Sequence, residues 1–362
     1  MKRDGRNVEI HLPLKEDAQP VAQKPRLVPY HMMDPLKQRI NQFIQEDITE
    51  EFPEHESITW CSPLVVQPKP KNQKDIRVSL DLRVLNKSME RTRQVQAPIT
   101  EDFIAMFKDC RVFVKLDMNH GYHQFTLDEP SRKLVTISSP WGNYRYKRLA
   151  FGGINSQDLF DSEMSKIISG IPKVLNNRDD ILVGGTNWDD HNANIAALLQ
   201  QLEMHNITLR KEKCEFGKSS IEFHGHLFTE NRLKPSPNKV KAVNECKPPK
   251  SREELVSFLQ MMAYLSRYIS NFSSRSEPLR KITRKGQKFA WLQEQQMAFE
   301  DLKKAITTAP VLIPYDPERQ TRVICNGSPT GVGGGLFQKT AKGYQPVHFV
   351  SRSLSETEKR HS

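Results

Sequence analysis

A short segment ending in two adjacent carboxylates constrains this chain most. Residues 174–185 read Val-Leu-Asn-Asn-Arg-Asp-Asp-Ile-Leu-Val-Gly-Gly, in which two apolar runs flank a polar turn. This pattern predicts a β-hairpin with Asp179 and Asp180 at its bend. Crowded carboxylates repel each other, and a bound cation relieves that repulsion. Most Asp-Asp pairs are nevertheless solvated turn residues, so the pair alone does not establish a metal site.

A second strand upstream ends in a third acid. The apolar residues Val112, Phe113, Val114 and Leu116 lead directly into Asp117. An acid at the end of a buried strand is costly unless it is paired or bound to metal. If this strand lies beside the hairpin, three carboxylates converge and can hold two Mg²⁺ ions for nucleotidyl transfer. Because successive strand residues face opposite ways, we expect Asp179 to be the shared ligand and Asp180 a supporting one.

Several motifs in a fixed order carry a family resemblance. They are Leu-Asp-Met-Asn-His-Gly-Tyr-His-Gln at 116–124, Leu-Ala-Phe-Gly at 149–152, Asp-Asp-Ile-Leu-Val at 179–183 and Lys-Cys-Glu-Phe at 213–216. Together they resemble the reverse transcriptase of a gypsy-type LTR retrotransposon Pol polyprotein, from about residue 20 to the C-terminus. The resemblance implies an RNA-directed DNA polymerase in which Asp117, Asp179 and Asp180 are catalytic and bind two Mg²⁺ ions, with Mn²⁺ as a substitute.

The resemblance also implies a nucleotide-binding set. Arg77 matches the arginine that grips the nucleotide phosphates, and Tyr122 would lie under the sugar and exclude a 2′-hydroxyl. The full set is Lys74, Arg77, Met118, Tyr122, Phe151 and Gly152. From the residues alone, the basic turn before Arg77 is a solvated hairpin and Tyr122 a core residue, and these alternatives stay open.

A later stretch matches the primer grip of the same family. Its residues are Phe223, His224, Gly225 and His226. The two histidines stand two positions apart with no third ligand, so no zinc site is expected. Contact with the primer phosphate and simple packing both remain open for them.

The chain departs from the family pattern beside the predicted site. Ala150 replaces a proline, and Asn155-Ser-Gln replaces the usual Ser-Ala-Pro, so loss of a turn-fixing proline is expected to loosen the nucleotide pocket. Asn177 replaces a common tyrosine, and Arg178 places a cation beside the metal site, where it would weaken metal binding.

The predicted fold is α+β. It is a right-hand polymerase fold of fingers, palm and thumb with an antiparallel palm sheet, followed by a connection and a partial ribonuclease H-like α/β segment. The predicted divisions are an extended N-terminal segment at 1–30, fingers and palm at 31–230, thumb at 231–290, connection at 291–318 and a truncated ribonuclease H-like domain at 319–362. Apolar spacing predicts helices over 34–51, 156–170 and 190–206, and Ser251 with Glu254 predicts a capping box.

The ribonuclease H-like segment lacks its first catalytic acid. Asn326 stands where the family has aspartate, and a neutral amide cannot replace a carboxylate at two divalent ions. We expect no ribonuclease H activity. We also expect this half-domain to expose unpaired strand edges.

Composition indicates the class of partner. The chain has 54 Lys and Arg against 43 Asp and Glu, a formal net charge of +11, which suits RNA template, DNA primer, RNA/DNA hybrid and deoxynucleoside triphosphates. Five scattered cysteines without a Cys-x-x-Cys indicate a reducing compartment. No apolar run approaches the roughly 18 residues of a membrane span. We expect a cytoplasmic protein, in virus-like particles and with nuclear access, whose partners include a second copy or polyprotein neighbours.

Two further interpretations remain open. A degenerate or co-opted remnant would bind nucleic acid without polymerising, and the departures at Ala150, Arg178 and Asn326 favour it. An RNA-synthesising polymerase is a weaker alternative, which Tyr122 opposes. Incorporation of deoxynucleotides by the folded protein separates the three.

Overall fold

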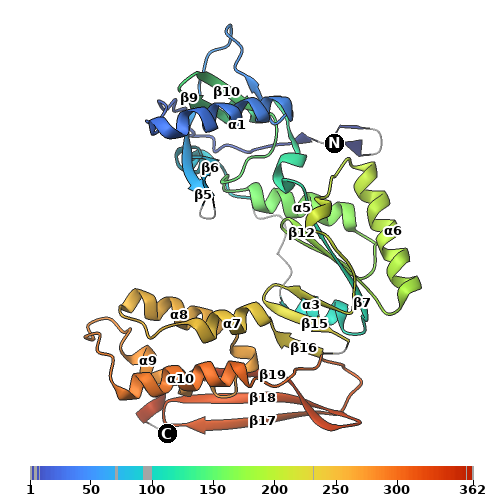
Figure 1. Cartoon of the computed structure of the whole chain (residues 1–362), viewed down its shortest axis with the longest axis vertical. Coiled ribbons are helices and arrows are strands. Elements are labelled where there is room, and N and C mark those ends of the chain that lie inside the picture. The colour runs from blue at the N-terminus through green and yellow to red at the C-terminus, as the bar shows by residue number, and fades with distance from the viewer. Residues whose placement is uncertain are drawn as a thin grey trace. The chain divides into compact units, whose positions relative to one another are not determined.

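The computed structural model describes residues 2–3, 6–7, 9–69, 72–92, 100–230, 232–355 and 357–360. Within these ranges, the side chains of residues 2–3, 6–7, 69, 72–74 and 100–101 are not described. The chain forms two compact units whose elements Figure 1 labels, each built from separate stretches. Unit 1 comprises residues 1–98, 114–183 and 192–216, and unit 2 comprises residues 99–113, 184–191 and 217–362.

Unit 1 contains a five-stranded sheet with one parallel pairing. Its strands, in spatial order, are β4 (Thr49–Glu51), β10 (Gly142–Tyr146), β9 (Thr136–Ser139), β5 (Ser62–Lys69) and β6 (Asn72–Leu80). Only β5 and β9 run parallel, and the other neighbours are antiparallel. Helix α1 (Met33–Gln45) contacts β4 and β6 and buries Leu36, Ile40 and Phe43.

The helix expected over 34–51 is too long. It ends at Gln45 because Asp47 adopts a φ of 55°, in the left-handed region that terminates helices. The Ile48 N–H then donates to the Phe43 carbonyl at 2.8 Å, and residues 49–51 form strand β4 instead. Apolar spacing continues across this stop, so periodicity alone could not locate it.

A second sheet carries the predicted acids. Its order is β11 (Val174–Asn177), β12 (Asp180–Gly185), β7 (Val112–Asp117) and β13 (Glu215–Lys218). The interiors of β7 and β12 are buried, with Val114, Leu116, Ile181 and Val183 all fully covered, whereas β13 is exposed. Helices α5 (Ser156–Ile168) and α6 (Trp188–Met204) confirm the helices expected over 156–170 and 190–206 to within two residues.

The described part of the N-terminal segment is tied into unit 1. Strand β3 (Glu9–Ile10) pairs in parallel with β8 (Thr126–Leu127). The Leu12 N–H donates to the Ser131 hydroxyl at 2.7 Å, and Ala22 forms a β-bridge with Cys61. Ile10 and Leu12 are buried in the core of this unit.

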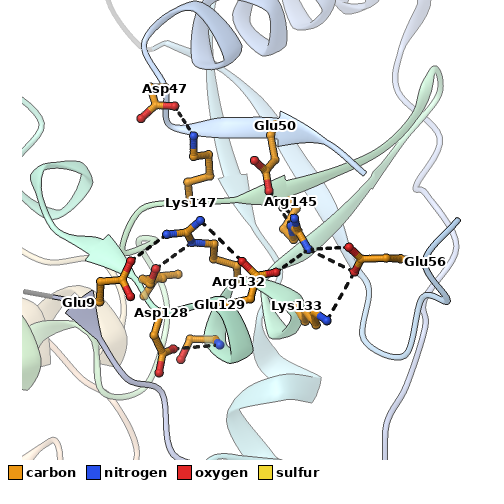
Figure 2. A network of polar contacts seen from close by, with 12 residues as sticks. Glu9, Asp47, Glu50, Glu56, Asp128, Glu129, Arg132, Lys133, Arg145 and Lys147 are labelled. Carbon is orange, nitrogen blue, oxygen red and sulfur yellow. Dashed lines mark hydrogen bonds and ion pairs between the residues drawn. The ribbon is translucent and has the colours of Figure 1, made fainter. Parts of the chain in front are cut away.

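A buried arginine on the five-stranded sheet contacts three acids (Figure 2). Arg145, on β10, is 6% exposed and contacts Glu50 at 2.7 Å and Glu56 and Glu129 at 3.3 Å. Glu129 begins α4 (Glu129–Leu134), so the arginine links β4, the loop after it and this helix. A guanidinium stays charged even when removed from water, so its burial is costly unless carboxylates pair with it.

Arg145→Met is expected to lower the free energy of unfolding by about 2–4 kcal/mol, because three carboxylates lose their shared cation in a buried setting. Lys147→Met is the matched control. Lys147 pairs with Asp47 at the surface in the same view, so its loss should lower that energy by less than about 1 kcal/mol. Urea unfolding of both variants measures the difference, and equal effects would contradict the role given to Arg145.

Unit 2 joins a small sheet to helices and a C-terminal sheet. Its helices are α3 (Thr100–Phe107), α7 (Pro237–Glu245), α8 (Arg252–Tyr264), α9 (Phe272–Lys281) and α10 (Gln293–Thr307). Its sheets are β14 (Ser220–Phe223), β15 (His226–Thr229) and β16 (Arg232–Pro235), and then β17 (Thr321–Ser328), β18 (Gly331–Thr340) and β19 (Gly343–Ser353). No helix in the described residues is both long and apolar enough to cross a membrane.

Two local expectations in unit 2 can be compared with the structure. The Ser251 hydroxyl caps α8 by accepting the Glu254 N–H at 3.2 Å, while the Glu254 carboxylate accepts from the Lys250 N–H rather than from Ser251. One hydrogen bond of the capping box is therefore formed as expected, and the other, accepted by the Glu254 carboxylate, comes from the backbone N–H one residue before Ser251. The expected strand edge is exposed, since β17 is an outer strand with seven of its eight residues exposed.

Candidate active site

Asp117 and Asp179 come from neighbouring strands of the second sheet. Asp117 is the last residue of β7, and Asp179 lies in the two-residue turn between β11 and β12. The Met118 N–H donates to the Asp179 carbonyl at 2.7 Å, which places the two acids side by side. Arg178 opens the turn with a φ of 56°, the positive value that tight hairpins require.

The Asp179 carboxylate is poorly compensated. Burial, together with the negative charges of Asp117 and Asp180, raises the pKa of Asp179 above its ordinary value. Its Oδ1 atom is buried and accepts no hydrogen bond from the described residues. An under-coordinated carboxylate oxygen of this kind is a hard ligand suited to a divalent cation.

Lysines neutralise the other two acids. The Lys213 ammonium lies 3.2 Å from Asp117 Oδ2, and the Lys115 ammonium lies 3.2 Å from Asp180 Oδ2. Among the described residues, no three His, Cys, Asp or Glu side chains form a group that could hold a metal ion. Each ion pair engages one carboxylate oxygen that a metal would use. With these amines displaced, the donor set fits a divalent ion held by Asp117 and Asp179.

A glycine admits the Asp179 side chain. A Cβ atom added at Gly121 would lie 2.4 Å from Asp179 Oδ1, far inside contact distance. The sequence analysis assigned Gly121 no role. Only the absence of a side chain allows the carboxylate to occupy its position.

Tyr122 lies close to the same aspartate. It belongs to the short 3₁₀ helix Gly121–Gln124, is 9% exposed, and its ring centre lies 4.4 Å from that of Phe151. Its hydroxyl donates to Gln157 Oε1. Burial raises the pKa of Tyr122 to about 12, so the hydroxyl stays protonated at neutral pH. The residue is thus packed like a core tyrosine and also stands beside the carboxylates.

The loop at Phe151 and Gly152 is held from one side by an asparagine. Asn86, in α2 (Arg83–Ser88), donates to the Gly152 carbonyl at 2.9 Å and accepts the Ile154 N–H at 2.8 Å. Gly152 has a φ of 93°, and Phe151 is 40% exposed. This loop therefore presents an open aromatic face on a fixed backbone.

The predicted phosphate ligands lie on β6. Arg77 is exposed there, opposite Gln67 of β5, so its guanidinium is accessible to solvent. The Lys74 side chain lies outside the described residues, and its role stays a prediction.

Hydrogen bonds fix the turn that lacks the expected proline. The Asn155 side chain donates to the Glu90 carbonyl at 2.7 Å, and the Ser156 hydroxyl donates to the Ala150 carbonyl at 2.8 Å. Gln157 follows and holds Tyr122. The polar substitutions thus supply contacts where a proline would have limited the backbone, which argues against a loosened pocket.

The predicted primer grip is a tight hairpin in unit 2. His224 and Gly225 form the turn between β14 and β15, with φ of 49° and 70°, as a type I′ turn requires. Phe223 is buried against Phe103. His226 is buried, lies 2.7 Å from the Tyr268 hydroxyl, and burial lowers its pKa to about 3. It is therefore a neutral packing residue, and no metal cluster includes it among the described residues.

The C-terminal sheet borders an apolar cavity of 1110 Å³. Val323, Val332 and Val350 line it together with Asn326, which is exposed on β17. None of the three predicted catalytic acids lines this cavity. The absence of ribonuclease H activity stays a prediction.

The described site thus brings acids from neighbouring elements of one sheet close to a buried tyrosine and an exposed aromatic loop. Two family models match the chain. Residues 68–228 match "Reverse transcriptase (RNA-dependent DNA polymerase)", and residues 291–362 match "RNase H-like domain found in reverse transcriptase". The chain therefore contains a stretch that matches reverse transcriptase and one that matches its RNase H-like domain, as the resemblance predicted.

The relatives are retrotransposon polyproteins. The chain is 26% identical over 361 residues to the Transposon Tf2-3 polyprotein of Schizosaccharomyces pombe, covering 99% of the chain and 26% of that polyprotein. It is 28% identical over 359 residues to the Retrovirus-related Pol polyprotein from transposon 297 of Drosophila melanogaster, covering 98% and 33%. The chain thus spans about a quarter to a third of these relatives, and a gypsy-type origin is consistent with both.

Solved structures share the fold. The foamy viral protease-reverse transcriptase dRH in complex with double-stranded DNA superposes with a TM-score of 0.85 at 19% identity, covering 98% of this chain and 62% of that one. The foamy viral protease-reverse transcriptase in complex with RNA/DNA hybrid gives 0.82 at 19% identity, covering 98% and 47%. The predicted α+β polymerase fold is confirmed. The domain boundaries at 30, 230, 290 and 318 stay predictions.

Proposed function

We propose that this chain is an RNA-directed DNA polymerase that uses Asp117, Asp179 and Asp180 to bind divalent metal. The reverse transcriptase family generally uses divalent metal, typically Mg²⁺. The observation that carries the proposal is the pairing of Asp117 with a buried, under-coordinated Asp179 on adjacent strands. Asp180, already paired with Lys115, takes the supporting role.

The reaction joins a primer to a deoxynucleotide. The primer 3′-hydroxyl oxygen attacks the α-phosphorus, a new P–O bond forms, and the bond from that phosphorus to the bridging oxygen breaks to release pyrophosphate. Two Mg²⁺ ions would lower the pKa of the 3′-hydroxyl and neutralise charge on the leaving group. Arg77 binds the triphosphate as a guanidinium fork. Positioning and electrostatics carry the catalysis, so no side-chain general base is required.

The remaining residues shape the nucleotide pocket. The Phe151 ring and the Gly152 backbone form one wall, which Asn86 holds in place. Tyr122 forms the floor, where its ring would meet a ribose 2′-hydroxyl. The partners that follow are an RNA template, a DNA primer, their hybrid and deoxynucleoside triphosphates, and the net charge of +11 suits all of them.

Primer extension tests the proposal. Folded protein with Mg²⁺, poly(rA)/oligo(dT) and dTTP should yield extended primer, and Mn²⁺ should replace Mg²⁺. No extension by folded protein with either ion would favour the non-polymerising remnant, provided that hybrid binding with a steep salt dependence persists. The remnant is not the favoured interpretation, because Asp117, Asp179 and Asp180 are all retained.

Gly121→Ala is expected to lower the incorporation rate about 10- to 50-fold. The new methyl group would meet Asp179 Oδ1 at 2.4 Å and displace the carboxylate by a fraction of an ångström. Primer extension under single-turnover conditions measures the effect. Gly142→Ala is the control for a glycine change, because nothing lies within 4 Å of a Cβ there, although its φ of 135° will lower stability. Full activity in Gly121→Ala would contradict the close approach.

A further inference from the structure

The ion pair between Lys115 and Asp180 lies inside the carboxylate cluster, and the proposed reaction does not use it. Lys115 Nζ lies 3.2 Å from Asp180 Oδ2, and the two side chains are 24% and 35% exposed. Lys115 stands two residues before Asp117 on β7, so both side chains lie on the same face of the sheet. Asp180 begins β12, the next strand in the sheet.

The lysine of the companion pair is more open to solvent. Lys213 reaches Asp117 at the same distance, but its side chain is 55% exposed and ends the short 3₁₀ helix Lys211–Lys213 before β13. A cation that is partly shielded from water is less screened than one that is mostly exposed. Lys115 is therefore the more firmly placed of the two counter-charges.

We propose that Lys115 is a positioning residue that withholds Asp180 from the divalent ion and thereby limits the metal affinity of the site. This inference rests on the proposed function, because it assumes that Asp117 and Asp179 are the ligands. An ammonium group has three donors and no acceptor, so it occupies a carboxylate oxygen that a metal would otherwise use. Its positive charge also repels an incoming cation at the neighbouring acids.

Lys115→Met is expected to bind Mn²⁺ about two- to fivefold more tightly than the wild type, the range that a partly exposed ion pair supports. Methionine keeps the length and apolar stem of the lysine but removes its charge. The metal-free variant should have a lower Tm than the wild type, because three clustered carboxylates lose a counter-charge. Added Mn²⁺ should therefore raise the Tm of the variant by more than that of the wild type.

The measurement uses the full chain with Mn²⁺ alone, without nucleic acid or nucleotide. The electron paramagnetic resonance signal of free Mn²⁺ gives the bound fraction during a titration. Lys166→Met is the matched control, because it removes the same charge from a pair with Glu163 on α5. It should leave Mn²⁺ affinity within twofold of the wild type. Unchanged or weaker binding by Lys115→Met would overturn the inference.

Asp180→Asn provides a second test if Lys115→Met does not fold. Because Lys115 already withholds Asp180, this change should alter Mn²⁺ affinity less than twofold, whereas Asp179→Asn should abolish binding. A loss in Asp180→Asn equal to that in Asp179→Asn would show that Asp180 is a full ligand and overturn the inference.

The two proposals fail separately. If wild-type protein does not extend primers but Lys115→Met still tightens Mn²⁺ binding, the polymerase assignment fails and the role of Lys115 stands. If the wild type extends primers but Lys115→Met leaves Mn²⁺ binding unchanged, only the role of Lys115 fails.

Discussion

Asp179→Asn is expected to reduce deoxynucleotide incorporation more than about a thousandfold, because the variant loses the carboxylate that is proposed to bind metal together with Asp117. Amide and carboxylate have nearly the same shape, so the hairpin and its contact with the Met118 N–H should persist. Single-turnover primer extension measures the loss. Asp189→Asn, an exposed acid on α6, is the matched control and should retain full activity.

The same substitution should raise the Tm of the metal-free protein. The pKa of Asp179 is raised above its ordinary value of 3.8, so its ionisation in the folded state is unfavourable. The stability it contributes is present below pH 3.8 and is lost as the pH rises through the raised pKa. Asp179→Asn avoids that loss, so its advantage should appear above pH 4 and widen toward neutrality. Mg²⁺ should stabilise only the wild type, and a destabilised or fully active variant would contradict the assignment.

Tyr122→Ala is expected to reduce the preference for deoxynucleotides over ribonucleotides about 100-fold. The preference in this proposal depends on a clash between the ring and a 2′-hydroxyl, and alanine removes the ring. The ratio of kcat/KM for dTTP and UTP on one template measures it. Tyr122→Phe is the control, because it keeps the ring and loses only the hydrogen bond to Gln157.

The Phe variant should retain most of the preference for deoxynucleotides. Its incorporation rate should fall modestly, because the Gln157 side-chain carbonyl loses the hydrogen bond that the Tyr122 hydroxyl donates. If Tyr122→Ala keeps the wild-type ratio while remaining folded, Tyr122 is only a core residue. That was the alternative that its packing against Phe151 and Phe160 left open.

The acids of the site could be predicted from the sequence because strand patterns are local. The apolar residues before Asp117 and the two apolar runs around Asp179 predicted a strand and a hairpin that carry the acids. From these patterns alone their adjacency was only a condition, which the sheet order meets. The family resemblance supplied the fold, which periodicity alone could not. The stop at Asp47 was missed because a left-handed residue leaves no signature in apolar spacing.

The counter-charges could not be predicted in the same way. Lys115 and Lys213 are ordinary residues in the sequence, and only the sheet order brings them against Asp180 and Asp117. The role of Gly121 is equally non-local, since the atom it makes room for lies 58 positions later in the chain. Long-range electrostatic pairs of this kind depend on three-dimensional packing, which no single-sequence pattern encodes.

The parallel pairing of β3 with β8 has a consequence for synthesis of the protein. Residues 9–10 pair with residues 126–127, so strand β3 stays without this partner during synthesis until more than a hundred further residues have appeared. Throughout that interval Ile10 and Leu12 are exposed to other nascent chains. We therefore expect translation speed between residues 10 and 130 to govern the soluble yield of this protein.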